Sequence, residues 1–214
     1  MDNPIVTSEY NEYEYWNHRY TRGGNSGGGS YKREGACKIK YINIYIQEAE
    51  VSSILDLGCG DGNIIFQIAK ENPTVNIIAL DISDFIINKN LKDKEKLGLH
   101  NIDFRASDVS DLSLSKEFKV DCVLCLDVLF HIREDVKFKN IIKNIDNIYN
   151  KIAIVSTWGP TFPKERCSTE LDSYEYYRDF KTEASILHFY KELILPSKTK
   201  AMYIYKKDLS NGFL

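Results

Sequence analysis

Three alternating glycines directly after an apolar run are the feature that most constrains the fold of this chain. Residues 54–62 read Ile-Leu-Asp-Leu-Gly-Cys-Gly-Asp-Gly. The apolar part predicts a buried strand. Gly58, Gly60 and Gly62 predict a tight turn into a helix. Because glycine has no side chain, a ligand can also approach the backbone closely there. Asp56 lies at the carboxyl end of this strand, the edge at which open α/β sheets bind ligands, so we expect a binding site there.

Two kinds of cofactor loop follow a strand in this way. A dinucleotide loop reads Gly-x-Gly-x-x-Gly, and its third glycine would stand where this chain has Asn63. The Asp-x-Gly-x-Gly-x-Gly order found here resembles motif I of the class I S-adenosylmethionine (SAM) methyltransferases. That resemblance implies a SAM site that includes Asp56, Gly58, Cys59 and Gly60.

A second apolar run, residues 75–80, ends in an acid. Asp81 lies 21 residues past Gly60 (81 − 60) and is followed by Ile82. A carboxylate at this place accepts two hydrogen bonds from a ribose diol, so Asp81 and Ile82 are expected to contact the cofactor. The alternative for Asp81 is a helix cap.

Two later segments continue the methyltransferase order. Residues 102–109 resemble motif III, and the resemblance implies that Asp108, with Val109 beside it, takes the adenine amino group. Residues 118–130 resemble motif IV, with Asp127 at the strand end. Turn formation remains the alternative for Asp108 and helix capping for Asp127. Four motifs in the correct order are far more specific than any one of them.

The end of the fourth strand carries the candidate catalytic residues. Methyl transfer from SAM is an in-line displacement, so the protein aligns the acceptor, removes its proton where it has one and excludes water. His131 is the candidate base because imidazole titrates near neutrality; its alternative is a packing or helix-start histidine. Asp127 is expected to orient His131 or to contact the SAM amino group. An anionic acceptor, such as a phosphate oxygen, would need no base.

The N-terminal region predicts a helix over residues 9–22. Tyr13, Trp16 and Tyr20 fall on one face of that helix. The face either packs on the main domain or closes over the cofactor, and the two alternatives are compatible.

A glycine-rich segment, residues 23–30, follows this helix. With the preceding residues it resembles the N-terminal signature of a group of small bacterial methyltransferases, Tyr-Trp…Gly-Gly-x-Ser-Gly. The resemblance implies a lid in which Tyr20 and Arg22 contact the cofactor, and we expect residues 16–30 to fold over the methionine end of SAM. The alternative is a flexible linker. At residues 32–34 the chain reads Lys-Arg-Glu where the group usually has Gly-Arg-Leu.

Strands alternate with helices along the rest of the chain. The pattern predicts helices at 31–48, 63–71, 83–97 and 134–149, and strands at 52–57, 75–80, 102–106, 119–125, 151–157 and 201–205. It indicates an α/β, Rossmann-like, mostly parallel sheet flanked by helices. The family resemblance implies seven strands and a C-terminal β-hairpin. We expect one domain, 1–214, with a helical lid (1–49), a SAM-binding core (50–157) and an acceptor region with the hairpin (158–214), in which residues 158–180 and the lid recognise the acceptor.

Composition limits the partners. The net charge of −3 over 214 residues provides no basic field for nucleic acid, and no apolar run approaches the ~20 residues of a membrane helix. The N-terminus does not resemble a signal peptide, and five cysteines form no disulfide framework, so we expect a cytoplasmic protein. Cys122 and Cys125 should point to opposite faces of one strand, and the four histidines lack metal-ligand spacing, so no metal is expected.

Together these features predict a methyltransferase that uses SAM, yields S-adenosylhomocysteine (SAH) and methylates a small molecule on oxygen: a sugar, a surface-glycan precursor, a phosphate-type group or a metabolite. The alternatives are a Rossmann-type oxidoreductase, which Asn63 argues against, and a non-catalytic SAM-binding partner protein. Residues 118–130 lack the Asn/Asp-Pro-Pro-Tyr/Phe/Trp signature of amino-methylating enzymes that act on bases or glutamine, which weakens nucleic acid as the substrate. We expect a monomer or a homodimer.

Overall fold

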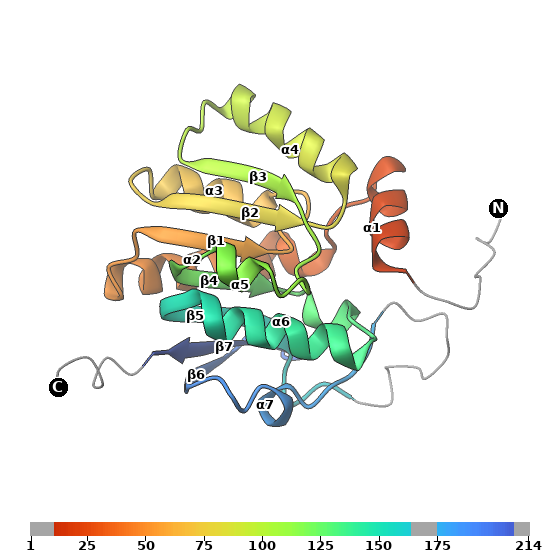
Figure 1. Ribbon diagram of the computed structural model, residues 1–214, viewed down its shortest axis with the longest axis vertical. Helices are drawn as coiled ribbons and strands as arrows, with labels where there is room; N and C mark the ends of the chain where they lie inside the picture. The colour runs from red at the N-terminus through yellow and green to blue at the C-terminus, as the bar shows by residue number, and fades with distance from the viewer. Residues whose placement is uncertain (1–10, 164–174, 208–214) are drawn as a thin grey trace.

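A seven-stranded sheet forms the centre of the computed structural model, which describes residues 11–163 and 175–207 (Figure 1). The strand order is β3-β2-β1-β4-β5-β7-β6. Strands β1 to β5 pair in parallel, whereas β7 runs antiparallel to both β5 and β6. The strands are β1 (Ser53–Leu57), β2 (Asn76–Asp81), β3 (Ile102–Ala106), β4 (Val120–Leu126), β5 (Tyr149–Trp158), β6 (Phe189–Ile194) and β7 (Lys200–Lys206). The predicted fold class, with its C-terminal hairpin, is confirmed.

Helices cover both faces of the sheet (Figure 1). One face packs against α2 (Lys32–Glu48), α3 (Asn63–Glu71) and α4 (Asp84–Leu97). The other packs against α5 (Leu114–Glu117), α6 (Asp135–Ile148) and α7 (Phe180–Glu183). Because successive strand residues point to opposite faces, Ile54 and Leu55 enter different cores, and so do Cys122 and Cys125, as expected from their spacing.

Most element boundaries lie within two residues of those expected from the periodicity. Helix α3 and strand β3 match their predicted ranges, and α4 ends at Gly98 in the left-handed conformation, φ +65°. Helix α1 (Glu12–Thr21) begins later than expected, where Asn11 accepts a hydrogen bond from the Glu14 amide. The range of β6 was not predicted, because this edge strand pairs only with β7 and none of its residues is buried.

The position of β1 creates the crevice of the sheet. β1 lies between β2 and β4: the chain runs outward from β1 through β2 to β3 and then returns to β4 on the other side of β1. The carboxyl ends of β1, β2 and β4 therefore meet beside a gap that the connecting helices do not fill, which is where open α/β sheets bind ligands.

Helix α1 crosses this carboxyl edge beyond the ends of β2 and β3 (Figure 1). Asn17 Oδ1 accepts from Ser83 Oγ at 2.7 Å and from the Phe85 amide at 3.3 Å, which ties α1 to the start of α4. Glu12 pairs with Lys137 of α6 at 2.8 Å. The helix is thus held on both sides of the crevice. Two short 3₁₀ helices, η1 (Gly28–Ser30) and η2 (Leu129–His131), also border that edge.

The first residue of α2 yields a stability prediction. Lys32 has φ +52° and an exposed side chain. The left-handed conformation costs a non-glycine residue roughly 1–2 kcal/mol. Lys32→Gly should therefore raise the free energy of unfolding by about 1 kcal/mol in urea titrations. Lys40→Gly, at an exposed position inside α2, should lower it by about 1 kcal/mol. Destabilisation by both substitutions would show that Lys32 carries no strain.

Candidate functional site

One cavity collects most of the residues expected at the cofactor. It lies at the carboxyl ends of the central strands, beneath α1 and the glycine-rich segment. The predicted residues that line it are Tyr20, Asp56, Gly58, Cys59, Gly60, Asp81, Ile82, Asp108, Val109, Asp127 and His131. Arg22 is not brought there: its side chain is exposed at the end of α1, outside this lining.

Further lining residues were not named as cofactor contacts, although three of them fall in residues 16–30, the segment that we expected to fold over SAM. Glu12, Trp16, Ser26, Ser30 and Lys137 also face the cavity. The aromatic stripe of the first helix and the glycine-rich segment were the only sequence signals for these positions. The Glu12–Lys137 pair had none, since its two partners lie far apart in the chain.

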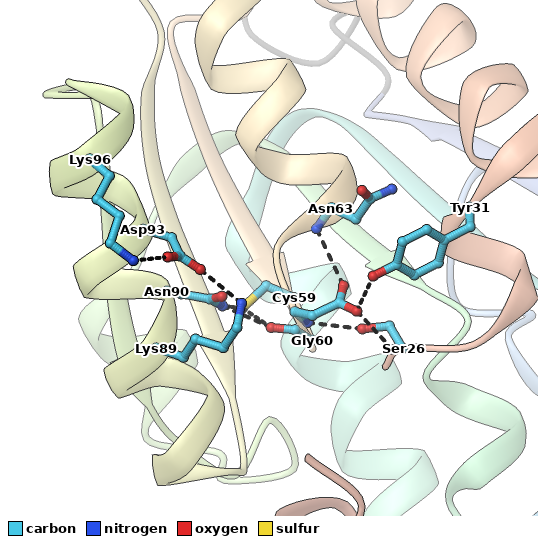
Figure 2. Close-up of polar contacts among 10 residues, drawn as sticks. Ser26, Tyr31, Cys59, Gly60, Asn63, Lys89, Asn90, Asp93 and Lys96 are labelled. Carbon is cyan, nitrogen blue, oxygen red and sulfur yellow. Dashed lines mark hydrogen bonds and ion pairs between the residues drawn. The ribbon is translucent and has the colours of Figure 1, made fainter. Parts of the chain in front are cut away.

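The glycine loop after β1 is held from two sides at Gly60. The Gly60 amide donates to Asp81 Oδ2 at 2.8 Å. The Gly60 carbonyl accepts from Asn90 Nδ2 at 2.8 Å (Figure 2). Its φ is +55°, and a Cβ there would lie 2.1 Å from Ser26 Oγ. Glycine is thus required at this position by both the backbone conformation and the approach of the lid.

Asp56 provides a test of fit for a cofactor. Its side chain is 3% exposed, and Oδ1 has no hydrogen-bond partner within the described part of the chain. Burial, reinforced by the nearby charge of Asp81, raises the pKa of Asp56 to about 7. An unpaired buried carboxylate oxygen is costly, so this position suits a ligand that brings a donor or a positive charge, as the amino group of SAM does.

Asp81 is buried and already ordered. Its carboxylate accepts from the amides of Gly60, at 2.8 Å, and Ser83, at 3.0 Å. Burial raises the pKa of Asp81 to about 6, although these hydrogen bonds oppose the shift. Ser83, and not Asp81, is the N-cap of α4. Because two carboxylate oxygens offer about four acceptor positions, Asp81 keeps capacity for ribose hydroxyls.

Asp108 combines a turn with a place in the cavity wall. Its Oδ1 accepts from the Ser110 amide at 2.8 Å and from Ser110 Oγ at 2.7 Å. Oδ1 of Asp108 thus stabilises a turn, as the alternative from the sequence predicted. It is compatible with a cofactor contact, because the second carboxylate oxygen has no partner among the described residues.

The carboxylate of Asp127 forms a buried ion cluster with two lysines. Its Oδ2 pairs with Lys38 Nζ at 2.7 Å and with Lys200 Nζ at 2.8 Å, and its Oδ1 accepts from Ser156 Oγ at 2.7 Å. Burial alone would raise the pKa of Asp127, but the two lysine cations more than offset it and hold the pKa well below its usual range. Within residues 11–163 and 175–207, these three side chains are the partners of the carboxylate. The expected orientation of His131 by Asp127 is thus not observed, because Lys38 and Lys200 bind Oδ2 of the carboxylate and Ser156 binds Oδ1.

His131 lies in the cavity wall, 7% exposed. Its ring meets Trp16 edge-on, with centroids 4.9 Å apart, and Phe130 at 4.4 Å. Phe130 stacks on Trp158 at 4.4 Å, and Trp158 stacks on Phe162 at 4.0 Å. The imidazole therefore joins the lid helix to an aromatic stack at the end of β5, the start of the predicted acceptor region. Residues 164–174 of that region lie outside the described part.

Comparison with known proteins identifies the family. Residues 49–208 match a family model described as a methyltransferase domain. The chain belongs to this methyltransferase family. Membership decides against the oxidoreductase alternative and agrees with the four motifs and with an Asp56 oxygen that has no partner among the described residues. Residues 49–208 thus form a methyltransferase domain, and SAM would supply a sulfonium-activated methyl group when bound.

Curated relatives are similar over part of their length. The chain is 31% identical over 93 residues to the probable (S)-tetrahydroprotoberberine N-methyltransferase 2 of Papaver bracteatum, a match covering 42% of this chain and 25% of that protein. Likewise, the N-methyltransferase 4 of Papaver somniferum is 28% identical over 131 residues, covering 54% of this chain and 37% of that protein. The chain thus matches well under half the length of these relatives.

A solved structure shares the fold. A SAM-dependent methyltransferase from Clostridium acetobutylicum ATCC 824 superposes with a TM-score of 0.67 over 92% of this chain and 99% of that one, at 14% identity.

Two classes of site find no support in the described residues. No group of three or more His, Cys, Asp or Glu side chains in residues 11–163 and 175–207 is arranged to hold a metal ion. Over the same residues, no helix has the length and apolar character to cross a membrane.

The buried carboxylates yield a pH prediction. Folding raises the pKa of Asp56 to about 7 and that of Asp81 to about 6, whereas unfolded aspartate titrates near 4. The folded protein without cofactor binds protons more tightly, so its stability falls as pH rises from about 4 to 7. Asp56→Asn should flatten this fall and raise Tm at pH 8 by roughly 2–4 °C, while weakening SAM binding. Thermal scans from pH 5 to 8, with Asp103→Asn as a surface control, check this. An unchanged slope for Asp56→Asn would contradict it.

Proposed function

We propose that this protein transfers the methyl group of SAM to a small-molecule acceptor, on an oxygen atom. The observation that carries the proposal is the position of His131, buried in the wall of the cofactor cavity and in ring contact with Trp16 of the lid. A base at that point reaches the space where an acceptor hydroxyl would meet the methyl group.

The strand-end acids divide the work of holding SAM. Asp81 takes the ribose hydroxyls, Asp108 the adenine amino group, and Asp56 the amino end of the methionine portion. The backbone of the glycine loop lets the cofactor approach closely. The burial of Asp56 and Asp81 in one cavity supports this assignment, since each needs a donor or a positive charge to offset its desolvation.

Asp127 is assigned no proton transfer. Its low pKa keeps it ionised, so it neither gives nor takes the acceptor proton. Lys38 and Lys200 offset its charge, and we assign it to holding the glycine-rich segment, because Gly29 packs against its carboxylate. His131 is left as the proton acceptor among the residues that we propose for catalysis.

We assign the acceptor wall to Trp16 and His131, whose rings line the cavity, with a buried aromatic stack behind His131. Trp158 and Phe162 stack at the end of β5, next to Phe130 and His131. A wall of this kind suits the apolar face of a small molecule and excludes water from the methyl group.

A nitrogen acceptor is the second candidate. The two Papaver relatives are named as N-methyltransferases. A neutral amine carries its own lone pair and needs no base at the moment of attack, so this candidate predicts turnover that does not depend on His131.

The resemblance to small bacterial enzymes with an N-terminal lid, the cytoplasmic location and the monomeric or homodimeric state remain predictions from the sequence.

Calorimetric titration with SAM, SAH and NAD in parallel tests the cofactor. We expect micromolar binding of SAM and SAH and no heat from NAD. Binding should be followed by screens of hydroxyl, phosphate and amine acceptors with SAH release as the readout. Binding of SAM with no turnover on any acceptor would favour the non-catalytic alternative, and NAD binding alone would overturn the cofactor assignment.

Substitution of the candidate base separates catalysis from binding. His131→Ala should lower kcat by roughly 10²–10⁴-fold on a hydroxyl acceptor, because proton removal is lost, while calorimetry still detects SAM binding. His188→Ala, an exposed histidine before β6, serves as the control. Full turnover by His131→Ala would remove His131 from the mechanism and favour an acceptor that needs no base.

A further inference from the structure

Two glycine-rich stretches far apart in the sequence meet at one carboxylate. Asp61, in the loop after β1, accepts from the Ser26 amide at 3.0 Å and from the Tyr31 hydroxyl through the same oxygen, Oδ2. In return, the Asp61 amide donates to Ser26 Oγ at 2.9 Å. Figure 2 shows Ser26 and Tyr31 converging on this loop from the N-terminal segment. Asp61 is thus bound reciprocally to the lid.

The segment that Asp61 holds is part of the cavity wall. Ser26 and Ser30 both line the cavity. Between them, Gly29 is buried against the end of β4: a Cβ at Gly29 would lie 1.8 Å from Asp127 Oδ2. The segment therefore passes from the cofactor loop to the end of β4 and forms one side of the cofactor site.

We propose that Asp61 is a positioning residue that latches the glycine-rich segment, residues 23–30, over the cofactor and thereby sets the rate at which the cofactor leaves. The proposal rests on the family's use of SAM and assigns Asp61 no contact with the reacting atoms.

The hydrogen bonds to the Asp61 carboxylate are the strongest ones between the loop after β1 and the N-terminal segment. Hydrogen bonds to an ionised acceptor are about twice as strong as neutral ones, and both lid donors share Oδ2. The neutral contact between Tyr20 and Ser26, at 3.4 Å, is longer. Loss of the charge should favour the open segment, and an open segment releases a bound ligand faster.

The latch is tested by the dissociation of radiolabelled SAM chased with unlabelled SAH. Asp61→Asn keeps the shape and removes the charge. We expect it to raise the dissociation rate roughly tenfold, with an association rate within about threefold of wild type. Tyr31→Phe removes one lid donor and leaves the cofactor loop unchanged, so it should give a smaller rise in the same direction.

A double-variant cycle supplies a readout that general loosening of the fold would not produce. If Asp61 acts through Tyr31, the effect of Asp61→Asn should be smaller in the Tyr31→Phe background than in wild type. Thermal scans of the cofactor-free proteins establish that each variant is folded.

A matched control lies in the same part of the molecule. Asp93 of α4 pairs with Lys89 at 2.8 Å and Lys96 at 3.0 Å and is drawn beside the loop in Figure 2. Its bonds reach neither glycine-rich stretch, so Asp93→Asn should leave the dissociation rate of SAM unchanged.

Three results would overturn the latch. One is a dissociation rate for Asp61→Asn within twofold of wild type. Another is additive effects of Asp61→Asn and Tyr31→Phe. The third is a loss confined to the association rate, which would mean that Asp61 shapes the empty loop. Failure of the wild-type protein to bind SAM would instead refute the cofactor assignment, so the two failures are distinguishable.

Discussion

Parallel pairing of β1 with both of its neighbours is the constraint on which the rest of this protein depends. Asp56 pairs in register with Ala79 of β2 and with Leu124 of β4, so the three strands end at one edge. Asp56, Asp81 and Asp127, which lie at the ends of these strands, reach one cavity for this reason. The lid could not close over a cofactor if the strand ends were dispersed, and the glycine loop would face a helix instead of a crevice.

Charge burial is the second determinant of the site. Lys38 is fully buried and pairs with Asp127, which Lys200 also contacts. Such clusters are costly to desolvate, and removal of one partner leaves an uncompensated charge inside the fold. Asp127 also adopts φ +60°, a conformation unusual for a residue other than glycine. The lysines and Ser156 hold this carboxylate in place, and Gly29 packs on it, so the charged cluster supports the glycine-rich segment from below.

The lid illustrates how far local patterns reach. The stripe of Trp16 and Tyr20 predicted a helix, which is observed, and both residues line the cavity. Arg22 follows the same stripe but is exposed, because α1 ends just before it. Strand β6 escaped prediction for a related reason: an edge strand has no buried face to impose an alternating pattern.

Local sequence patterns predicted most of the strand and helix ranges, the order of the four motifs and the placement of acids at strand ends, because periodicity and turn chemistry are local properties of the chain. Only the tertiary structure decided which acids keep a free oxygen and which are consumed. Asp56 and Asp127 both follow from the same strand-end pattern, yet Asp56 has an oxygen without a partner in the described part of the chain, whereas Asp127 binds two lysines. The difference arises because Lys38 and Lys200 come from helix and strand positions that no local pattern relates to Asp127. Side-chain pairing between distant segments exists only once the sheet has brought them together.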